Sequence, residues 1–420
     1  MRMNKKKEIV PKLRFPEFGT SEGWKKYKLR ELADRITKKV GDNKLVTLSI
    51  SAGIGFVSQA EKFSRDISGK QYCNYIYLKK GEFSYNKGNS KTFPQGCIYE
   101  LKEYEEAAVP NAFISFRFKE NLVPSFYQGY FDSNFHGKQL VRFITSGARS
   151  DGLLNISPTD FFSIVLPTPV KKEEQQRIAD CLSSIDDLID AESRKLKALE
   201  KYKKGLMQKL FPAEGKTMPE WRFPEFRGCG EWKYEEIGNI GEVITGKTPS
   251  TSDAALWDGD IQFVTPTDIT ENKYQHYTQR TVVKTPKMKV LPKHTIMFTC
   301  IASIGKMALS LYPCITNQQI NSIISKACYD NEFIYYSLLQ KTPSIKSGFA
   351  NSTLPIINKT DFSKIQIPVI LDKKEQQKIA DCLSEIDTII TEQSNKVEQL
   401  KAHKKGLMQG LFPSLEEADV

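Results

Sequence analysis

The sequence GEVITGKT at residues 241–248 has the spacing of a phosphate-binding loop, the most specific catalytic pattern in the chain. In such a loop, backbone amides and a helix N-terminus surround the phosphates, and a lysine reaches the terminal ones. Here the β-branched run at 243–245 favours a strand, and Pro249 follows where a helix would supply amide donors. We therefore interpret the pattern as a chance match. ATP binding that is lost on Lys247→Ala would contradict this interpretation.

Other catalytic patterns are missing from the 420 residues. The sequence has no Gly-x-Ser-x-Gly elbow, no His-Glu-x-x-His and no Asp/Asn-Pro-Pro-Tyr/Phe run. The eight cysteines include no Cys-x-x-Cys pair and the four histidines are spread out, so we expect no zinc site. Cys181 and Cys382 stand next to apolar neighbours, which favours a packing role. We therefore expect a binding protein without a catalytic site, metal or cofactor of its own.

Loops rich in hydrogen-bonding side chains, with lysine or arginine nearby, are the remaining candidates. Such side chains pair with base edges in the major groove of DNA, while lysine and arginine neutralise phosphates. In the first half the candidates are Asn86, Lys87, Asn89, Ser90, Lys91, Arg149 and Ser150. In the second half they are Lys247, Thr248, Ser250, Thr265, Thr267, Asn317, Gln318, Gln319, Asn351 and Ser352. For each loop an ordinary turn is the alternative, and residues 265–268 could instead cap a helix that begins at Ile269.

The net charge of +11 is concentrated in the first part of the chain. Residues 1–169 hold 27 Lys and Arg against 17 Asp and Glu, whereas residues 371–420 hold seven against ten. A basic domain suggests a polyanionic partner, of which nucleic acid is the commonest. The N-terminal MRMNKKKE has no apolar segment behind it, and the longest apolar run, at 295–305, is too short to span a bilayer. We therefore expect a cytoplasmic protein in a reducing environment.

Two copies of one helical sequence must position these loops. EEQQRIADCLSSID at 173–186 returns as KEQQKIADCLSEID at 374–387, and each run closes in KKGLMQ-x-LFP. Residues 171–212 and 372–413 are identical at 25 of 42 positions without a gap. The repeat therefore predicts a copied frame that holds two variable parts.

A second repeat precedes each variable part. PKLRFPEF at 11–18 is echoed by PEWRFPEF at 219–226, and Trp24 and Trp232 keep the same offset. Two prolines in each copy exclude a regular helix or an inner strand, so these are extended docking segments. Their recurrence predicts a duplication of the whole chain.

Apolar residues recur along both helical copies in steps of three and four, which is typical of a coiled-coil seam. The first seam is Ile178, Leu182, Ile185, Ile189, Leu196, Leu199, Leu206 and Leu210; the second is Ile379, Leu383, Ile386, Ile390, Val397, Leu400, Leu407 and Leu411. Polar breaks occur at the same two steps, Glu192 and Lys203 against Gln393 and Lys404. Each helix should be a rod of roughly 60 Å. The simplest partner for each rod is the other copy.

The blocks between the repeats, 27–165 and 234–366, share almost no sequence but have parts in the same order. Short β-rich runs come first, then a helical segment, at 124–144 and at 333–340, and then a loop. We predict an α+β fold: two α/β domains joined by two long antiparallel coiled-coil helices, with an internal pseudo-two-fold repeat. The predicted boundaries are 1–169 for the first domain with its docking segment, 170–212 for the central helix, 213–370 for the second domain, and 371–420 for the C-terminal helix and tail.

This organisation resembles the specificity subunit of type I restriction–modification enzymes. The resemblance covers nearly the whole chain and rests on the paired EQQ-x-IADCLS-x-ID helices with their KKGLMQ-x-LFP ends and on the RFPEF segments. Further matches are TGKTPS, FVTPTDI and TNQQINSI in the second block and GLLNIS in the first.

The resemblance implies that the blocks are target recognition domains, each of which reads one half of a split, asymmetric sequence in double-stranded DNA. The helix pair would hold them about one DNA turn or more apart, on the order of 34 Å. It further implies no catalysis by this chain. Its partners would be two adenine methyltransferase subunits, which use S-adenosylmethionine, and ATP-driven restriction subunits. Exposed faces of the repeated helices and the RFPEF segments would be the docking sites.

Two alternative functions fit parts of the same sequence. A stand-alone coiled-coil DNA-binding regulator would account for the basic charge and the rods, and would bind DNA without a methyltransferase in a gel shift. A phosphate-loop enzyme would bind ATP.

Overall fold

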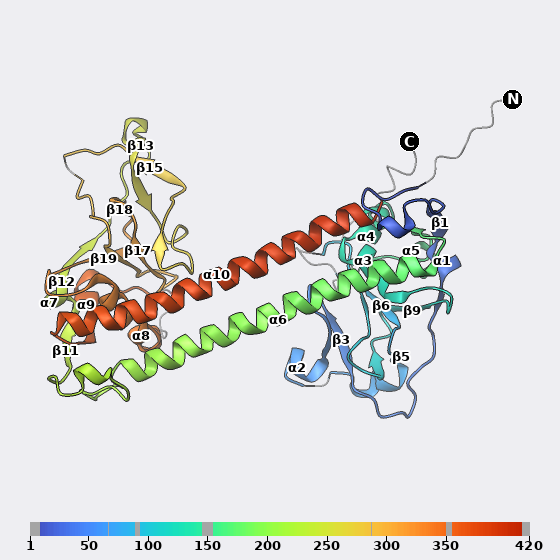
Figure 1. Ribbon diagram of the computed structural model, residues 1–420, viewed down its shortest axis with the longest axis horizontal. Helices are drawn as coiled ribbons and strands as arrows, with labels where there is room; N and C mark the ends of the chain where they lie inside the picture. The colour runs from blue at the N-terminus through green and yellow to red at the C-terminus, as the bar shows by residue number, and fades with distance from the viewer. Residues whose placement is uncertain are drawn as a thin grey trace. The chain divides into compact units, whose positions relative to one another are not determined.

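The computed structural model describes residues 9–65, 67–88, 93–144, 154–286, 288–349 and 355–413. The chain forms two compact units, the first from Met1–Ala191 with Val397–Val420 and the second from Glu192–Lys396. Two long helices, α6 (Lys172–Leu210) and α10 (Lys373–Leu411), each contribute a segment to both units (Figure 1). Each helix has 39 residues, close to the predicted length.

The first unit contains the first domain, residues 25–168. Its strands are β1 (Lys25–Lys28), β2 (Ala33–Arg35), β3 (Leu48–Ser51), β4 (Gly55–Ser58), β5 (Ile76–Lys79), β6 (Phe83–Asn86), β7 (Cys97–Glu100), β8 (Glu106–Val109), β9 (Ile114–Phe118) and β10 (Val165–Thr168). Its helices are α1 (Leu29–Leu32), α2 (Gln59–Phe63), α3 (Pro124–Asp132), α4 (Phe135–Leu140) and α5 (Pro158–Phe161), with 3₁₀ turns η1 (Pro16–Phe18), η2 (Gly69–Asn74) and η3 (Val141–Phe143). The main sheet has the order β2-β9-β6-β7, and β3 pairs with β4 and β5 with β8.

The second unit contains the second domain, residues 233–369. Its strands are β11 (Lys233–Glu236), β12 (Gly241–Thr245), β13 (Trp257–Val264), β14 (Tyr274–Gln275), β15 (Arg280–Val282), β16 (Ile296–Thr299), β17 (Met307–Ser310), β18 (Cys314–Thr316), β19 (Ile320–Ser325) and β20 (Gln366–Val369). Its helices are α7 (Ile237–Ile240), α8 (Asn331–Phe349) and α9 (Lys359–Ser363), with 3₁₀ turns η4 (Pro224–Phe226) and η5 (Ala254–Leu256). The sheets have the orders β12-β19-β16-β17-β14 and β15-β13-β18.

The two domains share one strand order although their sequences share almost nothing. β2 and β12, β9 and β19, β6 and β16, and β7 and β17 take the same places in the two main sheets. The first strand of each domain pairs antiparallel with the strand before the long helix, β1 with β10 and β11 with β20. β14 extends the second sheet by a parallel pair with β17. The predicted α+β fold with two α/β domains and two long helices is confirmed.

Local sequence accounts for these elements. In β9 the residues Ile114, Phe116 and Phe118 share one face and enter the core, while on the other face Ser115 is buried against Ser84 and Arg117 is exposed. The predicted helix at 124–144 was wrong as a single element. α3 ends at Asp132, and Asn134 takes a left-handed conformation with φ of 55° before α4 begins, a conformation that its short polar side chain tolerates. The helix predicted at 333–340 is longer and forms α8.

Within each unit, segments of α6 and α10 run antiparallel. In the first unit the Lys404 ammonium lies 2.7 Å from Asp186 Oδ1. In the second unit Gln393 Nε2 donates to Glu192 Oε2 at 2.7 Å, and Lys203 pairs with Asp387. The polar steps of the seams therefore lie in hydrogen bonds or ion pairs. All sixteen apolar seam residues are buried or half-buried.

The glutamate of each EQQ sequence fastens the docking segment to its helix. In the first unit Arg14 donates to both carboxylate oxygens of Glu174 at 2.8 Å, and in the second Arg222 donates to both oxygens of Glu375 at 2.7 Å. Both carboxylates are at most 1% exposed. Planar arginine suits such two-point contacts. The RFPEF repeat therefore supplies the arginine that the buried glutamate requires.

The following glutamine of each copy joins the helix to its domain. Gln175 Oε1 accepts from the amide of Val123 at 3.1 Å, and Gln376 Oε1 accepts from the amide of Asp330 at 2.7 Å. In each unit the amide that donates to the glutamine belongs to the residue immediately before the domain helix, which is α3 in the first unit and α8 in the second. This paired geometry aligns the two units residue by residue.

None of the described helices is long and apolar enough to cross a membrane. The described residues also hold no group of three or more His, Cys, Asp or Glu side chains that could bind a metal. The buried cysteines Cys97, Cys300 and Cys314 form no disulfide. Burial raises the pKa of Cys97 and Cys300 to about 11 and that of Cys314 to about 12, so these thiols stay protonated and pack as apolar groups.

Candidate nucleic-acid interface

In the second domain, a parallel strand pair brings two of the predicted loops together. β13 and β18 run parallel, with Val264 opposite Thr316, so the loops that begin at Thr265 and Asn317 leave the sheet side by side. The amide of Asn317 donates to the carbonyl of Val264 at 3.1 Å. Carboxyl ends of parallel strands meet at one edge of a sheet, where ligands commonly bind.

A third predicted loop, 246–250, joins this edge from β12. β12 pairs antiparallel with β19, and the amide of Lys247 donates to the carbonyl of Thr316 at 2.8 Å. Thr248 Oγ1 donates to Gln318 Oε1 at 2.7 Å. GEVIT forms a strand as expected, and within the described stretch 154–286 no α-helix follows the loop, only the 3₁₀ turn η5. A phosphate-binding loop lacks its helix N-terminus here, and the three loops form one polar surface instead.

The side chains of this surface divide into exposed groups and groups that hold the loops in shape. Lys247, Ser250, Thr267 and Gln318 are exposed, while Thr248, Thr265 and Gln319 are half-buried. Asn317 is buried, where its Nδ2 donates to Gln319 Oε1 at 2.9 Å and its Oδ1 accepts from the Gln319 amide at 3.1 Å. Its amide group is therefore used within its own loop.

The helix cap considered for residues 265–268 is wrong, because no helix begins at Ile269 in this described segment. The Asp268 carboxylate instead accepts from the Thr265 amide at 2.8 Å and from Thr265 Oγ1 at 2.6 Å. Its other oxygen accepts from the amide of Gln279 at 2.9 Å. Asp268 therefore closes a turn and leaves Thr267 at its tip.

An apolar hollow lies beside the 246–250 loop. This cavity of about 790 Å³ is lined by Lys247, Thr248 and Ser250 together with apolar side chains that include Ile244, Leu256, Met288, Leu291 and Ile315. Polar groups next to an apolar wall match the edge of a base pair that carries a thymine methyl group.

In the first domain, the described parts of the predicted loops meet at their bases. Asn86 ends β6, and its Oδ1 accepts from the Gly88 amide at 2.9 Å. The carbonyl of Lys87 accepts from the amide of Leu154 at 2.9 Å, so the loop after β6 lies against the loop before α5. The candidates Asn89, Ser90, Lys91, Arg149, Ser150, Asn351 and Ser352 lie outside the described residues.

The fold adds candidates that the sequence did not single out. The β16–β17 hairpin takes the place of the β6–β7 hairpin, so its loop with Ser303 and the exposed Lys306 is equivalent to the loop after Asn86. Arg280 stacks on Trp257 with its guanidinium carbon 3.5 Å from the ring centroid, next to the 246–250 loop. The β16–β17 loop becomes a candidate only through the shared strand order of the two domains. Arg280 becomes one only because the pairing of β13 with β15 places it on Trp257.

The chain matches the family described as "Type I restriction modification DNA specificity domain" over residues 21–201 and again over 230–401. The specificity subunit of the type I restriction enzyme MjaIX from Methanocaldococcus jannaschii is 33% identical over 194 residues, 44% of this chain and 45% of that subunit. The putative MjaX specificity subunit of the same organism is 28% identical over 298 residues, 69% of this chain and 67% of that subunit. The chain thus spans under half of the first relative and two thirds of the second.

Solved structures share the fold. The S subunit of a type I restriction–modification system from M. genitalium superposes with a TM-score of 0.62 at 16% identity, covering 96% of this chain and 99% of that one. A chain from a type I system studied for its complex assembly and conformational transition gives 0.56 at 15% identity, covering 94% and 97%. The two matched ranges take in both variable domains and most of each long helix, up to residues 201 and 401. The chain therefore belongs to the type I restriction–modification DNA specificity family, and each of its two domains lies within one of the two matched ranges.

Proposed function

We propose that this chain selects a bipartite, asymmetric sequence in double-stranded DNA and that each domain contacts one half of it. The observation that carries the proposal is that two domains of one strand order present unlike polar loops at equivalent places. Identical folds dock on DNA in the same way, and different side chains then select different bases.

The second domain supports this proposal in detail. Exposed Lys247 and Arg280 offer positive charge for phosphates, while Ser250, Thr267 and Gln318 offer donors and acceptors for base edges. In the first domain, the excess of Lys and Arg over Asp and Glu in residues 1–169 likewise attracts the DNA phosphates. We assign the predicted loop residues of both domains, together with Arg280 and Lys306, to the DNA interface, where the buried Asn317 holds its loop in shape.

The long helices would set the separation of the two half-sites. α6 and α10 pair within each unit through apolar seams and through Lys203–Asp387 and Lys404–Asp186 contacts. A helix fixes the distance between its ends because its rise per residue is constant. Because the two half-sites differ and their spacing is fixed, the DNA target does not have to be a palindrome.

Exchange of residues 27–165 for the corresponding block of a relative should change only one half of the methylated DNA sequence. The chimera is expressed with a methyltransferase partner, and sequencing of the methylated genome identifies its target. Exchange of residues 234–366 is the matched control and should change only the other half. If either chimera changed both halves, the assignment of one domain to one half-site would be wrong.

We further propose that two adenine methyltransferase subunits, which use S-adenosylmethionine, and restriction subunits assemble on this chain. Exposed apolar residues recur at equivalent places on the two helices, which suits a partner that binds twice. Leu188 of α6 and Ile389 of α10 are 43% and 42% exposed, and Val170 and Leu371, two residues before each helix, are also exposed. Such apolar surface is costly in water unless a partner covers it.

The variants Leu188→Lys and Ile389→Lys test this docking. Each should change the free energy of unfolding by less than about 0.5 kcal/mol, because the side chain is already exposed. Each should also lower the number of methyltransferase subunits bound per chain from two to one, as measured by sedimentation. Gly205→Ala, in open space on α6, is the matched helix control. Two subunits bound to the double variant would place the docking surface elsewhere.

A further inference from the structure

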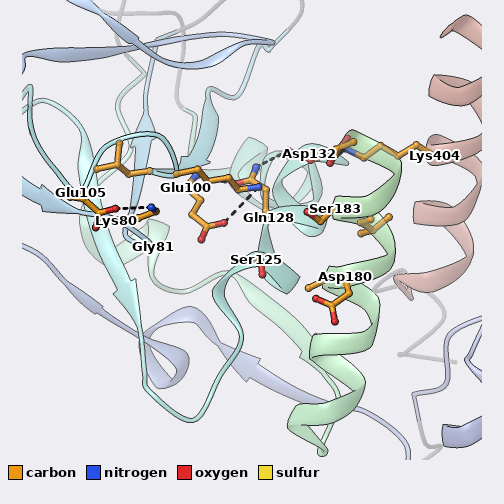
Figure 2. A pocket seen from close by; sticks show the side chains of 16 residues that line it. Lys80, Gly81, Glu100, Glu105, Ser125, Gln128, Asp132, Asp180, Ser183 and Lys404 are labelled. Carbon is orange, nitrogen blue, oxygen red and sulfur yellow. Dashed lines mark hydrogen bonds and ion pairs between the residues drawn. The ribbon is translucent and has the colours of Figure 1, made fainter. Parts of the chain in front are cut away.

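The first unit contains a cavity of about 570 Å³ that DNA recognition does not explain. It lies between the first domain, α3, the start of α6 and the end of α10 (Figure 2). Its carboxylates are Glu100, Glu105, Asp132, Asp180 and Asp186, and its lysines are Lys80, Lys102 and Lys404. Five carboxylates against three lysines leave a formal charge of −2, opposite in sign to the first 169 residues of the chain. A phosphate group would be repelled here.

The second unit shows what occupies the equivalent place. The units correspond closely at this point: Phe126 packs on Trp24 and Phe412 in the first, and Phe333 packs on Trp232 and Phe211 in the second. Tyr130 donates to the Pro167 carbonyl at 2.5 Å, and Ser337 donates to the Pro368 carbonyl at 2.6 Å. These pairs align α3 with α8 residue by residue.

In the second unit an ammonium group sits at this place. Lys273 Nζ donates to Ser384 Oγ at 2.7 Å and to Glu332 Oε2 at 2.8 Å. Tyr336 fills the remaining space and donates to Asp387 at 2.5 Å. The Lys273 side chain is 10% exposed, so the second unit carries its own buried cation against α10.

The first unit keeps the equivalent side chains on its long helix but has smaller residues in the domain helix that faces them. Ser183 and Asp186 of α6 stand where Ser384 and Asp387 stand on α10. Gly129 takes the place of Tyr336, and Ser125 takes the place of Glu332. Phe412 packs over the Gly129 backbone, where an added Cβ atom would lie 2.3 Å from its Cζ atom, so it is the small Ser125 that leaves the cavity open.

The cavity offers acceptors on two opposite sides. In Figure 2 Glu100 and Glu105 lie on the domain side, while Asp132 and Asp180 lie on the helix side. Glu105 already pairs with Lys80 at 2.7 Å, and Asp132 already accepts from Gln128 at 2.6 Å, so Glu100 and Asp180 are the acceptors on which a ligand would depend. The Glu100 side chain is 11% exposed, and its Oε2 accepts no hydrogen bond from any described residue, with Lys102 Nζ 3.9 Å away. Burial raises the pKa of Glu100 and of Asp132, so a nearby cation would favour their charged forms.

We propose that this cavity binds an aliphatic diamine or polyamine, with one ammonium group between the helix carboxylates and Ser183 and another at Glu100. The charge of −2 matches a dication, and the two acceptor sides suit two ammonium groups joined by an apolar chain. The volume is within the range of small-molecule sites. At the equivalent place in the second unit, the Lys273 ammonium group already binds to Glu332 and Ser384, which shows that this part of the fold accommodates an alkylammonium group.

Isothermal titration calorimetry of the full chain with putrescine, without DNA and at constant ionic strength, tests the proposal. One saturable site per chain is expected, with half-saturation at about 1 mM or below. Glu100→Gln and Asp180→Asn should each weaken binding about tenfold, because each removes one charged acceptor. Asp180 is exposed, so its substitution leaves the fold intact, and thermal unfolding without ligand verifies this for both variants.

Asp381→Asn is the matched control, because Asp381 takes the equivalent exposed position on α10 and accepts from Gln377 as Asp180 accepts from Gln176. Its affinity for putrescine should be unchanged. The proposal is overturned if no saturable heat appears, if Asp381→Asn weakens binding as much as Asp180→Asn, or if 1,4-butanediol binds as well as putrescine. The outcome is independent of DNA recognition, because no DNA is present.

Discussion

Arg222→Ala is expected to lower the free energy of unfolding by about 3–5 kcal/mol. Arg222 donates to both oxygens of Glu375, whose side chain is 0% exposed, and no other described side chain donates to that carboxylate. The substitution leaves the Glu375 carboxylate buried and unpaired. The free-energy cost of that unpaired charge is larger than the net stabilisation that the ion pair supplied. Urea unfolding followed by circular dichroism measures the loss.

The equivalent variant Arg14→Ala is the matched control and should cost less. Trp24 Nε1 donates to Glu174 Oε1 at 3.0 Å, so one donor remains after the arginine is removed. In the second unit the Trp232 Nε1 atom is buried and has no partner among the described residues. A larger loss for Arg14→Ala than for Arg222→Ala would mean that the indole contributes little and that the two clamps differ for another reason.

Gly246→Ala should reduce the affinity of the assembled enzyme for its DNA target by about 10–100-fold. A Cβ atom at this position would lie 2.2 Å from the Thr316 carbonyl oxygen and 2.3 Å from that of Asn317. Both contacts are to backbone, so the 246–250 loop must move away from the Asn317–Gln319 loop. The polar surface built from three segments would then lose its shape.

Gly205→Ala provides the control for this variant. Gly205 lies within α6 and has no atom within 4 Å of an added Cβ, so alanine should stabilise the chain by about 1 kcal/mol and leave DNA affinity unchanged. Filter binding with methylation-site DNA measures the affinity of both variants. Full affinity of Gly246→Ala, with an intact fold, would remove the 246–250 loop from the interface.

The two largest predictions differ in what the sequence reveals about them. Arg222 and Glu375 both belong to repeats, RFPEF and EQQ, so the sequence marks both residues but not their contact. They are 153 residues apart, and nothing local specifies that pairing. Gly246 belongs to the apparent phosphate-binding loop in the sequence, whereas its close approach to Thr316 depends on the pairing of β12 with β19.

Helix interruptions and turns were the least predictable features. The apolar pattern at 124–144 is continuous, but Asn134 adopts a left-handed conformation that splits it into α3 and α4. Thr265 to Asp268 has the composition of a helix cap, but its hydrogen bonds close a turn whose carboxylate also holds Gln279. Caps and turns use the same side chains, so distant partners decide between them.

The sequence by itself determined the duplicated frame, because a helix is specified by local spacing and the same spacing occurs twice with 25 of 42 residues identical. It also determined which parts vary, and through its resemblance to one family the role of the chain. Only the tertiary structure decided which loops share a surface, because β13 and β18 or β12 and β19 are brought together by non-local strand pairing. Only the tertiary structure, too, showed that one copy of the frame holds a buried lysine where the other leaves a cavity, since the difference lies in Lys273, Glu332 and Ser125, outside the repeats that the sequence aligns.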